Sequence, residues 1–365
     1  AQAYGSNQYN EIIDLVFRNI IFVIVISLLL ICFQNFIFNL GLQIFDLSND
    51  TEKYFNDYFY IRIYSSFGEL SIYVITGLFI GLQKTKTSSL MVGFFSITNI
   101  IFSLFFVLYL KLNVTGVALG TLVSSTLTSF IFLIYTFFEL KKLTIINFDI
   151  KKIFNIKKIK NIFNINFNIF IRSVLLTFSF LFFTYLGNTI SEDVVAANTI
   201  LINLIFLSAF ILDAYAFSTE GIVGYSIGSK NITLLRNVIK NSFILSVFTS
   251  LLISLLYFSS KNYFISLMTD LPNIEIISLS YSYWVVIIPL ISSFCYQFDG
   301  IFVGASQTKE LRNAMIISVC IYIISAVYLI SNFGNLGLWI SFSIFFISRA
   351  LTLFAYVGRI YKKIE

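Results

Sequence analysis

The segment GLFIGLQKTK at residues 77–86 recurs as GIFVGASQTK at residues 300–309, after an offset of 223 positions. The same offset places the dipeptide Gly5-Ser6 on Gly228-Ser229. Matching segments at one fixed offset are the signature of an internal repeat. The sequence therefore predicts two related halves, each built from the same order of elements.

The first half is shorter than the second at its N-terminal end. Two long apolar segments, at about 161–187 and 193–226, precede Gly228, whereas only Ala1–Tyr4 precede Gly5. The chain also begins with alanine rather than methionine. We therefore expect an N-terminally truncated chain, with two apolar spans missing before its first residue.

The composition indicates an integral membrane protein and gives no sign of an enzyme. Of the 365 residues, 58% are hydrophobic and 12% are charged, whereas soluble domains carry about a quarter charged residues. Histidine, the commonest metal ligand and general base, is absent. Cys32, Cys295 and Cys320 lie within apolar runs without CxxC spacing, which is typical of inert thiols. We expect no catalytic residue.

Apolar runs separated by charged breaks predict an all-α, polytopic fold with two pseudo-symmetric helical lobes. A spanning helix needs about 20 mainly apolar residues, and its backbone must pair internally in lipid. The predicted spans number ten, at about 11–45, 56–82, 88–110, 115–139, 161–187, 193–226, 236–258, 275–305, 310–331 and 336–359.

The loop charges predict the orientation of these helices. Seventeen lysines and arginines fall in alternate loops and at the C-terminus, whereas the opposite loops carry only Lys53, Lys111 and Lys261. Because cytoplasmic loops carry the excess of basic residues, we expect a cytoplasmic C-terminus and a plasma (inner) membrane location. The net charge of +6 thus reflects topology, and we expect no nucleic-acid partner.

The lysine-rich segment 141–160 divides the predicted lobes, an N-lobe at 1–140 and a C-lobe with six spans at 161–365. The segment is consistent with an amphipathic helix on the membrane surface or with a solvated linker. Each lobe ends after a corresponding span of the same orientation, which indicates a parallel repeat. Parallel repeats around a central substrate site are an architecture of secondary transporters.

Charged side chains inside predicted spans are the candidate functional residues, because each costs roughly 3 kcal/mol to insert. Asp213 and Glu220 lie seven residues apart on one face of the helix at 193–226. Asp299 lies in the helix at 275–305, Arg172 lies in the helix at 161–187, and Glu69 is the candidate in the first half. Two carboxylates on one face can exchange a proton or coordinate a cation.

Each candidate also has a simpler interpretation. Glu220 and Asp299 can reach water if they lie near the cytoplasmic ends of their helices, and Arg172 can extend to the membrane surface. Arg349, in the last helix, is interpreted as a helix-end or inter-helix partner. Pro289 predicts a kink in the helix at 275–305.

Several motifs together resemble the multidrug and toxic compound extrusion (MATE) transporters, specifically the DinF-like branch. The resemblance covers nearly the whole chain and implies twelve helices in two six-helix lobes, of which this chain is similar to helices three to twelve. The motifs are AQAYGSNQY at 1–9, GLFIGLQKTK at 77–86, NFNIFIRS at 166–173, VAANTIL at 195–201, DAYAFSTEGIVGYSIGS at 213–229 and DGIFVGASQTKELRNAM at 299–315.

The resemblance implies an antiporter that exports organic cations or amphipathic compounds in exchange for protons or sodium ions. It implies a small-molecule substrate, the lipid bilayer as surroundings, and no cofactor besides the ion gradient; we expect a monomer. The matching positions here are Asp213, Glu220 and Asp299, with Arg172 nearby, and any sodium ion would bind near Asp213. The choice between proton and sodium stays open.

Two departures from the family pattern concern the first lobe. The first helix, which carries an important acidic residue in the family, is absent. The branch usually shows Asn followed four residues later by Asp in its fifth helix, whereas here Asn99 is followed by Ser103. The resemblance therefore places the coupling residues of this chain in the second lobe.

Three rival interpretations remain. A flippase of lipid-linked saccharides would favour a wide cationic cavity, whereas the central charges here are mostly acidic. An intramembrane aspartyl protease would use Asp213 and Asp299, but the GxGD pattern of such enzymes is missing, since Gln297-Phe298 precede Asp299. A truncated, non-functional transporter is the third interpretation.

Overall fold

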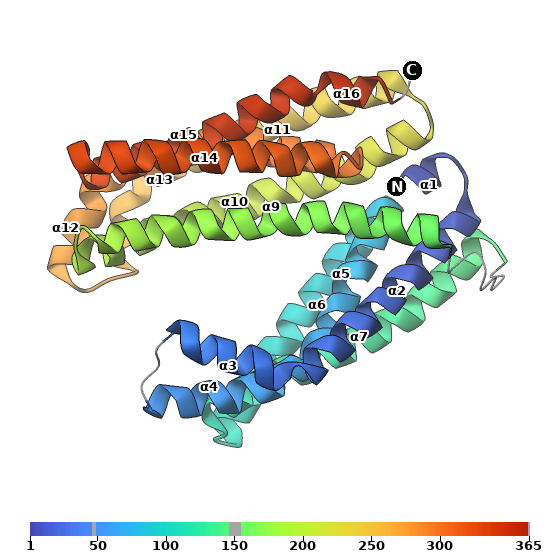
Figure 1. Cartoon of the computed structure of the whole chain (residues 1–365), viewed down its shortest axis with the longest axis horizontal. Coiled ribbons are helices and arrows are strands. Elements are labelled where there is room, and N and C mark those ends of the chain that lie inside the picture. The colour runs from blue at the N-terminus through green and yellow to red at the C-terminus, as the bar shows by residue number, and fades with distance from the viewer. Residues whose placement is uncertain (46–48, 146–154, 364–365) are drawn as a thin grey trace. The chain divides into compact units, whose positions relative to one another are not determined.

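The computed structural model describes residues 1–45, 49–145 and 155–363, and these residues fold into helices without any strand (Figure 1). Ten helices in these ranges are long and apolar enough to cross a membrane, which confirms the predicted all-α, polytopic fold. Residues 146–154 of the lysine-rich segment predicted to link the lobes lie outside the described ranges.

The chain divides into two compact units. The N-terminal unit is Asn7–Ile159, and the C-terminal unit combines Ala1–Ser6 with Lys160–Glu365. The first six residues therefore pack with the second half of the chain, which the lobe boundaries predicted at 140 and 161 do not anticipate. Those boundaries otherwise remain predictions.

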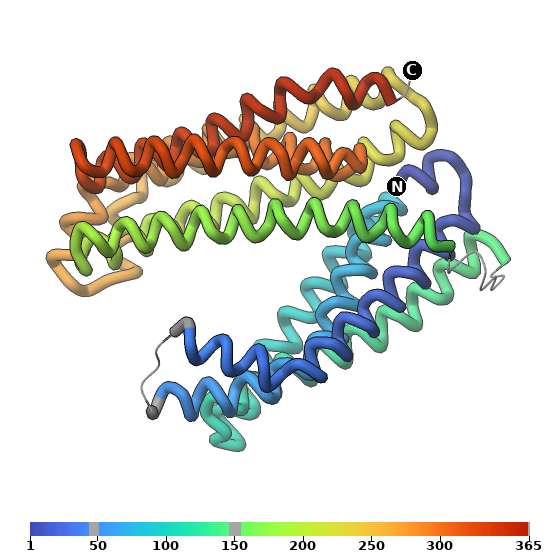
Figure 2. The backbone as a smooth tube through the Cα atoms, in the orientation of Figure 1, coloured from blue at the N-terminus to red at the C-terminus, as the bar shows by residue number. Residues whose placement is uncertain are grey.

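In the N-terminal unit, two of the predicted helices are interrupted. The apolar run predicted as one helix at 11–45 breaks at Phe33, and a single 3₁₀ turn divides the run predicted at 56–82 (Figure 2). The elements are α2 (Tyr9–Cys32), α3 (Gln34–Phe45), α4 (Asn49–Arg62), the 3₁₀ turn η1 (Ile63–Ser65), α5 (Ser66–Gly81), α6 (Thr85–Leu104), the π-helical turn η2 (Phe105–Tyr109) and α7 (Asn113–Leu143).

In the C-terminal unit, α10 and α11 begin with side-chain caps: Ser191 Oγ accepts the amide of Val194, and Asn231 Oδ1 accepts that of Leu234. The run predicted at 275–305 breaks at Ser282, so that Pro289 lies inside the second piece. The elements are α1 (Gln2–Gly5), α9 (Ile156–Asn188), α10 (Glu192–Gly228), α11 (Ile232–Ser266), α12 (Pro272–Tyr281), α13 (Tyr283–Gly304), α14 (Thr308–Phe333), α15 (Asn335–Tyr356) and α16 (Gly358–Tyr361).

The internal repeat is visible in the backbone. Residues with positive φ are uncommon, yet six of the seven in the described chain, all but Asn113, recur at the offset of 223 that relates the repeated segments. Each member of a pair has nearly the same φ as its counterpart. The pairs are Asn7 with Lys230 (57° and 53°), Gln83 with Ser306 (59° and 53°), and Lys111 with Gly334 (55° and 56°).

Repeat-related residues also contact each other where α1 crosses α10. A Cβ atom on Gly5 would lie 2.3 Å from the carbonyl oxygen of Tyr225, and a Cβ atom on Gly228 would lie 2.0 Å from that of Gln2. Both the glycines and the two carbonyl residues are separated by 223 positions, so the crossing is locally two-fold. Only glycine permits so close an approach of the two backbones.

The core of the C-terminal unit is aromatic and holds α9, α14 and α15 together. Phe183, Tyr322, Trp339 and Phe342 are fully buried and stack at angles typical of aromatic clusters. Figure 1 shows α14 and α15 side by side, as their extensive contacts indicate.

A buried polar network ties the start of α15 to α10. Asn198 and Asn335 exchange two amide hydrogen bonds of 2.7 and 3.1 Å, and Trp339 Nε1 donates to Asn198 Oδ1 at 2.9 Å. Because these three side chains satisfy each other, their burial carries little penalty. The aromatic core and this network fix α10 relative to α15, two of the four helices that carry charged residues of the site described next.

Candidate functional site

The centre of the site is Asp299 on α13, which lies between two arginines. Arg172 on α9 and Arg349 on α15 both donate to its Oδ2 atom. Arg349 is 1% exposed and Asp299 is 8% exposed, so the pair lies in the interior of the C-terminal unit. Asp299 is therefore held by two cations and does not reach water at a helix end, in contrast to the simpler interpretation of the sequence.

This charged group keeps unused hydrogen-bonding capacity. Asp299 Oδ1, Arg172 Nε, and Arg349 Nε and Nη1 are buried and have no partner within the described ranges. Buried polar atoms normally find partners, and each missing one costs roughly 1–3 kcal/mol. The four atoms thus keep the capacity to form further hydrogen bonds.

Asp213 and Glu220 lie on α10, two helical turns apart, and both are half-buried. Neither forms a hydrogen bond or an ion pair with any residue of the described chain. Arg172 is close enough to influence both carboxylates electrostatically, and Asp213 is also within range of Asp299 and Arg349. The structure therefore brings four of the five predicted residues together in one unit.

Close packing of α13 on α10 sets the spacing of these carboxylates. A Cβ atom on Gly300 would lie 2.3 Å from the carbonyl oxygen of Ala216, and a Cβ atom on Gly304 would lie 2.4 Å from that of Glu220. Beside this contact, Thr219 Oγ1 donates to Gln297 Oε1 at 3.2 Å. In this second copy of the repeated motif, the two glycines therefore serve close helix packing, as glycine does in membrane helices.

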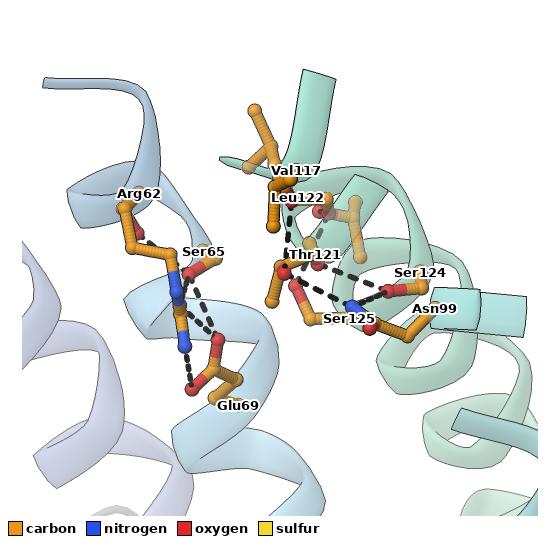
Figure 3. A network of polar contacts seen from close by, with 10 residues as sticks. Arg62, Ser65, Glu69, Asn99, Val117, Thr121, Leu122, Ser124 and Ser125 are labelled. Carbon is orange, nitrogen blue, oxygen red and sulfur yellow. Dashed lines mark hydrogen bonds and ion pairs between the residues drawn. The ribbon is translucent and has the colours of Figure 1, made fainter. Parts of the chain in front are cut away.

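Glu69, the fifth predicted residue, lies in the N-terminal unit and has a local partner. Arg62, seven residues earlier, donates to both of its carboxylate oxygens across the η1 turn, and Ser65 Oγ donates to Oε1 at 2.9 Å (Figure 3). The Glu69 carboxylate is therefore ion-paired, whereas those of Asp213 and Glu220 have no ion-pair partner in the described chain.

Asn99 and Ser103, where this chain departs from the family pattern, belong to a second polar group, which lies on α6 and α7. Asn99 Nδ2 donates to Thr121 Oγ1 at 2.9 Å and to Ser124 Oγ at 3.3 Å (Figure 3). Ser103 Oγ is buried without a partner in the described chain and lies against Gly120. These residues are neutral, so the group carries no charge of its own.

Sequence reasoning missed the ion-pair partners. The sequence predicts Arg349 as a helix-end or inter-helix partner, but no spacing in it indicates Asp299, 50 residues away, as the acid with which it pairs. The pairing of Arg62 with Glu69 had a signal, since the two residues lie seven apart in one apolar run. Arg18, 2% exposed, pairs with the nearby Glu11 and Asp14, and the four-residue spacing from Asp14 also predicts contact.

The site shows no ready-made metal centre. Among the residues that the structure describes, no group of three histidine, cysteine, aspartate or glutamate side chains could hold a metal ion. Asp213 and Glu220 supply two carboxylates, and hydroxyl or carbonyl oxygens would have to complete a sodium site.

Comparison with known proteins identifies the family of this chain. The sequence profile of the MatE family matches residues 1–105 and 169–330. DNA damage-inducible protein F of Escherichia coli (strain K12) is 27% identical over 355 residues, which are 97% of this chain and 77% of that protein. A multidrug resistance MATE family transporter of the MOP superfamily, solved in an outward-facing conformation, aligns with a TM-score of 0.87 at 16% identity, over 99% of this chain and 84% of that one.

A MATE transporter of Vibrio cholerae aligns with a TM-score of 0.83 at 17% identity, over 99% of this chain and 81% of that one. These comparisons do not support the expected N-terminal truncation. The structural alignments establish the shared fold, and the MatE profile matches well over half of the chain. This chain therefore belongs to the MatE family of membrane transporters.

Proposed function

We propose that this transporter is a secondary antiporter, which exports organic cations or amphipathic compounds in exchange for protons or sodium ions. The observation that carries the proposal is the pair Asp213 and Glu220, two half-buried carboxylates on one face of α10 without partners among the described residues. Acidic groups inside membrane helices usually mark pathways for ions or substrates. The inner membrane and a cytoplasmic C-terminus are part of the same proposal.

Asp213 is the proposed coupling residue. Its carboxylate is free to take up a proton, a sodium ion or a cationic substrate, whereas that of Asp299 is held by two arginines. Glu220 lies two turns along the same face and extends the negative surface. Arg172, within electrostatic range of both, lowers the number of cations that the group can hold at once.

Exchange follows from competition for these carboxylates. A bound coupling cation neutralises Asp213 and removes the attraction for a cationic substrate, and a bound substrate excludes the coupling cation. If the site switches between the two sides of the membrane only when either the coupling cation or the substrate is bound, each cycle moves the cation and the substrate in opposite directions. Alternating access in repeat transporters provides such a change.

The test uses the chain in liposomes, with ethidium as the cationic probe and an imposed pH or sodium gradient. We expect one gradient to drive ethidium movement, and Asp213→Asn to abolish it. Asp193→Asn removes an exposed carboxylate from the first turn of the same helix and is expected to leave transport unchanged. Unchanged transport by Asp213→Asn would exclude the assigned role, and movement without either gradient would exclude antiport.

The alternative of a lipid-linked saccharide flippase has no specific support at this site. A pyrophosphate-binding cavity needs excess positive charge. Here the side chains supply two arginines and three carboxylates, those of Asp213, Glu220 and Asp299, so they give no excess of positive charge.

A further inference from the structure

A wholly apolar groove lies within the C-terminal unit, between α11, α13 and α15. Its volume is about 530 Å³, which falls within the range of about 300–1,000 Å³ typical of ligand pockets. Phe243, Phe294, Phe298, Leu351 and Phe354 form most of its lining. The groove is separate from the charged site, because Phe298 and Ala350 line it while the neighbouring Asp299 and Arg349 pair in the interior.

The groove opens on the outer surface of the spanning helices. Leu351 is 63% exposed and Phe354 is 66% exposed, and both lie on a helix that can cross the membrane. In a bilayer such a surface faces lipid acyl chains. A flat apolar face exchanges lipids freely, whereas a concave one of this volume surrounds a chain and retains it.

One end of the groove carries basic side chains on α11. Arg236, Lys240 and Phe243 follow each other at i, i+4 and i+7, and therefore lie along one stripe of the helix. The Arg236 guanidinium lies over the ring of Tyr361, 5.9 Å from its centroid, on the short helix that follows α15. The stripe thus runs from the groove, at Phe243, toward the short helix α16 (Gly358–Tyr361), with the two cations just beyond the Phe243 end.

Lys240 has no competing partner. It is exposed and forms no hydrogen bond or ion pair with the part of the chain that is described. Two other cations at this end are already engaged, since Arg359 pairs with Glu310 and Lys363 Nζ donates to the carbonyl oxygen of Ala305 at 2.6 Å. The Glu310 carboxylate is held by Arg359, so the positive charge at Lys240 stays available.

We propose that this groove binds one anionic phospholipid, with an acyl chain between α11, α13 and α15 and its phosphate-bearing headgroup at Lys240 and Arg236. The apolar lining selects a hydrocarbon chain. The charges select an anionic headgroup, because basic residues at the membrane surface attract anionic lipids by about 1 kcal/mol each, roughly a fivefold change in affinity.

The test is native mass spectrometry of the whole chain in detergent, titrated with phosphatidylglycerol or with phosphatidylcholine of the same acyl chains. We expect one retained phosphatidylglycerol and weaker binding of phosphatidylcholine. Lys240→Gln is expected to weaken phosphatidylglycerol binding roughly fivefold and to leave phosphatidylcholine binding unchanged. The matched control is Lys309→Gln, which removes an exposed lysine from α14, a helix that does not line the groove.

A second variant tests the groove itself. Leu351→Trp fills the groove from an exposed position, where the larger side chain does not disturb the core, and is expected to weaken binding of both lipids. Unchanged binding by Leu351→Trp would place the lipid elsewhere. Equal losses for Lys240→Gln and Lys309→Gln would indicate diffuse attraction to a basic surface, and equal affinity for the two lipids would indicate an unselective acyl-chain slot. Each of these results would overturn the proposal.

Discussion

Asp299 and Asp213 are both acidic residues inside membrane helices, but their surroundings give them different tasks. Asp299 holds Arg172 and Arg349 together and so joins three helices, whereas Asp213 has no ion-pair partner among the described residues. Removing one member of a buried pair leaves an uncompensated charge, which is expensive in a medium of low dielectric constant. Substitutions at these two positions should therefore affect stability very differently.

We predict that Arg349→Met lowers the free energy of unfolding by about 3–5 kcal/mol, because the arginine is fully buried in its contact with Asp299. Asp213→Asn should change it by less than about 1 kcal/mol, as substitutions that break no such contact usually do. Unfolding in SDS, followed by the fluorescence of Trp284 and Trp339, measures both variants. A smaller loss for Arg349→Met than for Asp213→Asn would contradict the assignment of Asp299 as the structural acid.

At this scale the sequence shows where charges lie within the helices but does not predict how they pair. Asp213, Glu220, Asp299 and Arg172 were found because charges are rare in apolar runs. The contact between Asp299 and Arg349 joins positions far apart in the chain, and no local spacing reveals such a contact. The same rule predicts Glu69 as a candidate, but the carboxylate of Glu69 forms an ion pair with Arg62.

At the scale of helices, the first glycine of the repeated motif has a close neighbour in one copy and none in the other. Gly300 lies against the backbone of α10, whereas its counterpart Gly77 has open space, with no atom within 4 Å of the place that a Cβ atom would take. The same residue type at the same place in the repeat therefore meets two different surroundings. This difference allows a test in which each position controls for the other.

We predict that Gly300→Ala destabilises the chain by about 1–3 kcal/mol, because its methyl group would force α13 away from α10. Gly77→Ala should be neutral or stabilising by up to about 1 kcal/mol, since alanine favours helices. Thermal unfolding in detergent compares the two variants. A loss of stability for Gly77→Ala as large as that for Gly300→Ala would show that this glycine also has a packing partner.

The sequence predicted all ten spans but not the breaks within them. Phe33 and Ser282 interrupt apolar runs that contain no glycine or proline at the break, so composition gives no signal there. Pro289, the residue that predicts a kink, lies inside α13 instead. Tertiary packing therefore decides where these helices end, whereas their existence follows from length and hydrophobicity.

For the whole molecule, the duplicated sequence and the alternating loop charges lead to the same topology. The backbone repeats its positive-φ residues at one offset, which supports two halves of the same fold. A parallel repeat requires corresponding turns of the two halves to lie on the same side of the membrane. The turns at Gln83 and Ser306 are such a pair, and both are followed by lysines that the charge rule assigns to the cytoplasm.

We predict that cysteines introduced just before α12 and at the start of α14 react from opposite sides of the inner membrane. In a background with Cys32, Cys295 and Cys320 replaced by serine, Lys309→Cys should react with a membrane-impermeant maleimide only from the cytoplasmic side. Asp270→Cys, which precedes α12 in an exposed turn, should react only from the outside. One span separates the two positions, and the lysine-rich side faces the cytoplasm. Labelling of both from one side would contradict the predicted span, and labelling in the reverse sense would invert the topology on which the proposed cation export depends.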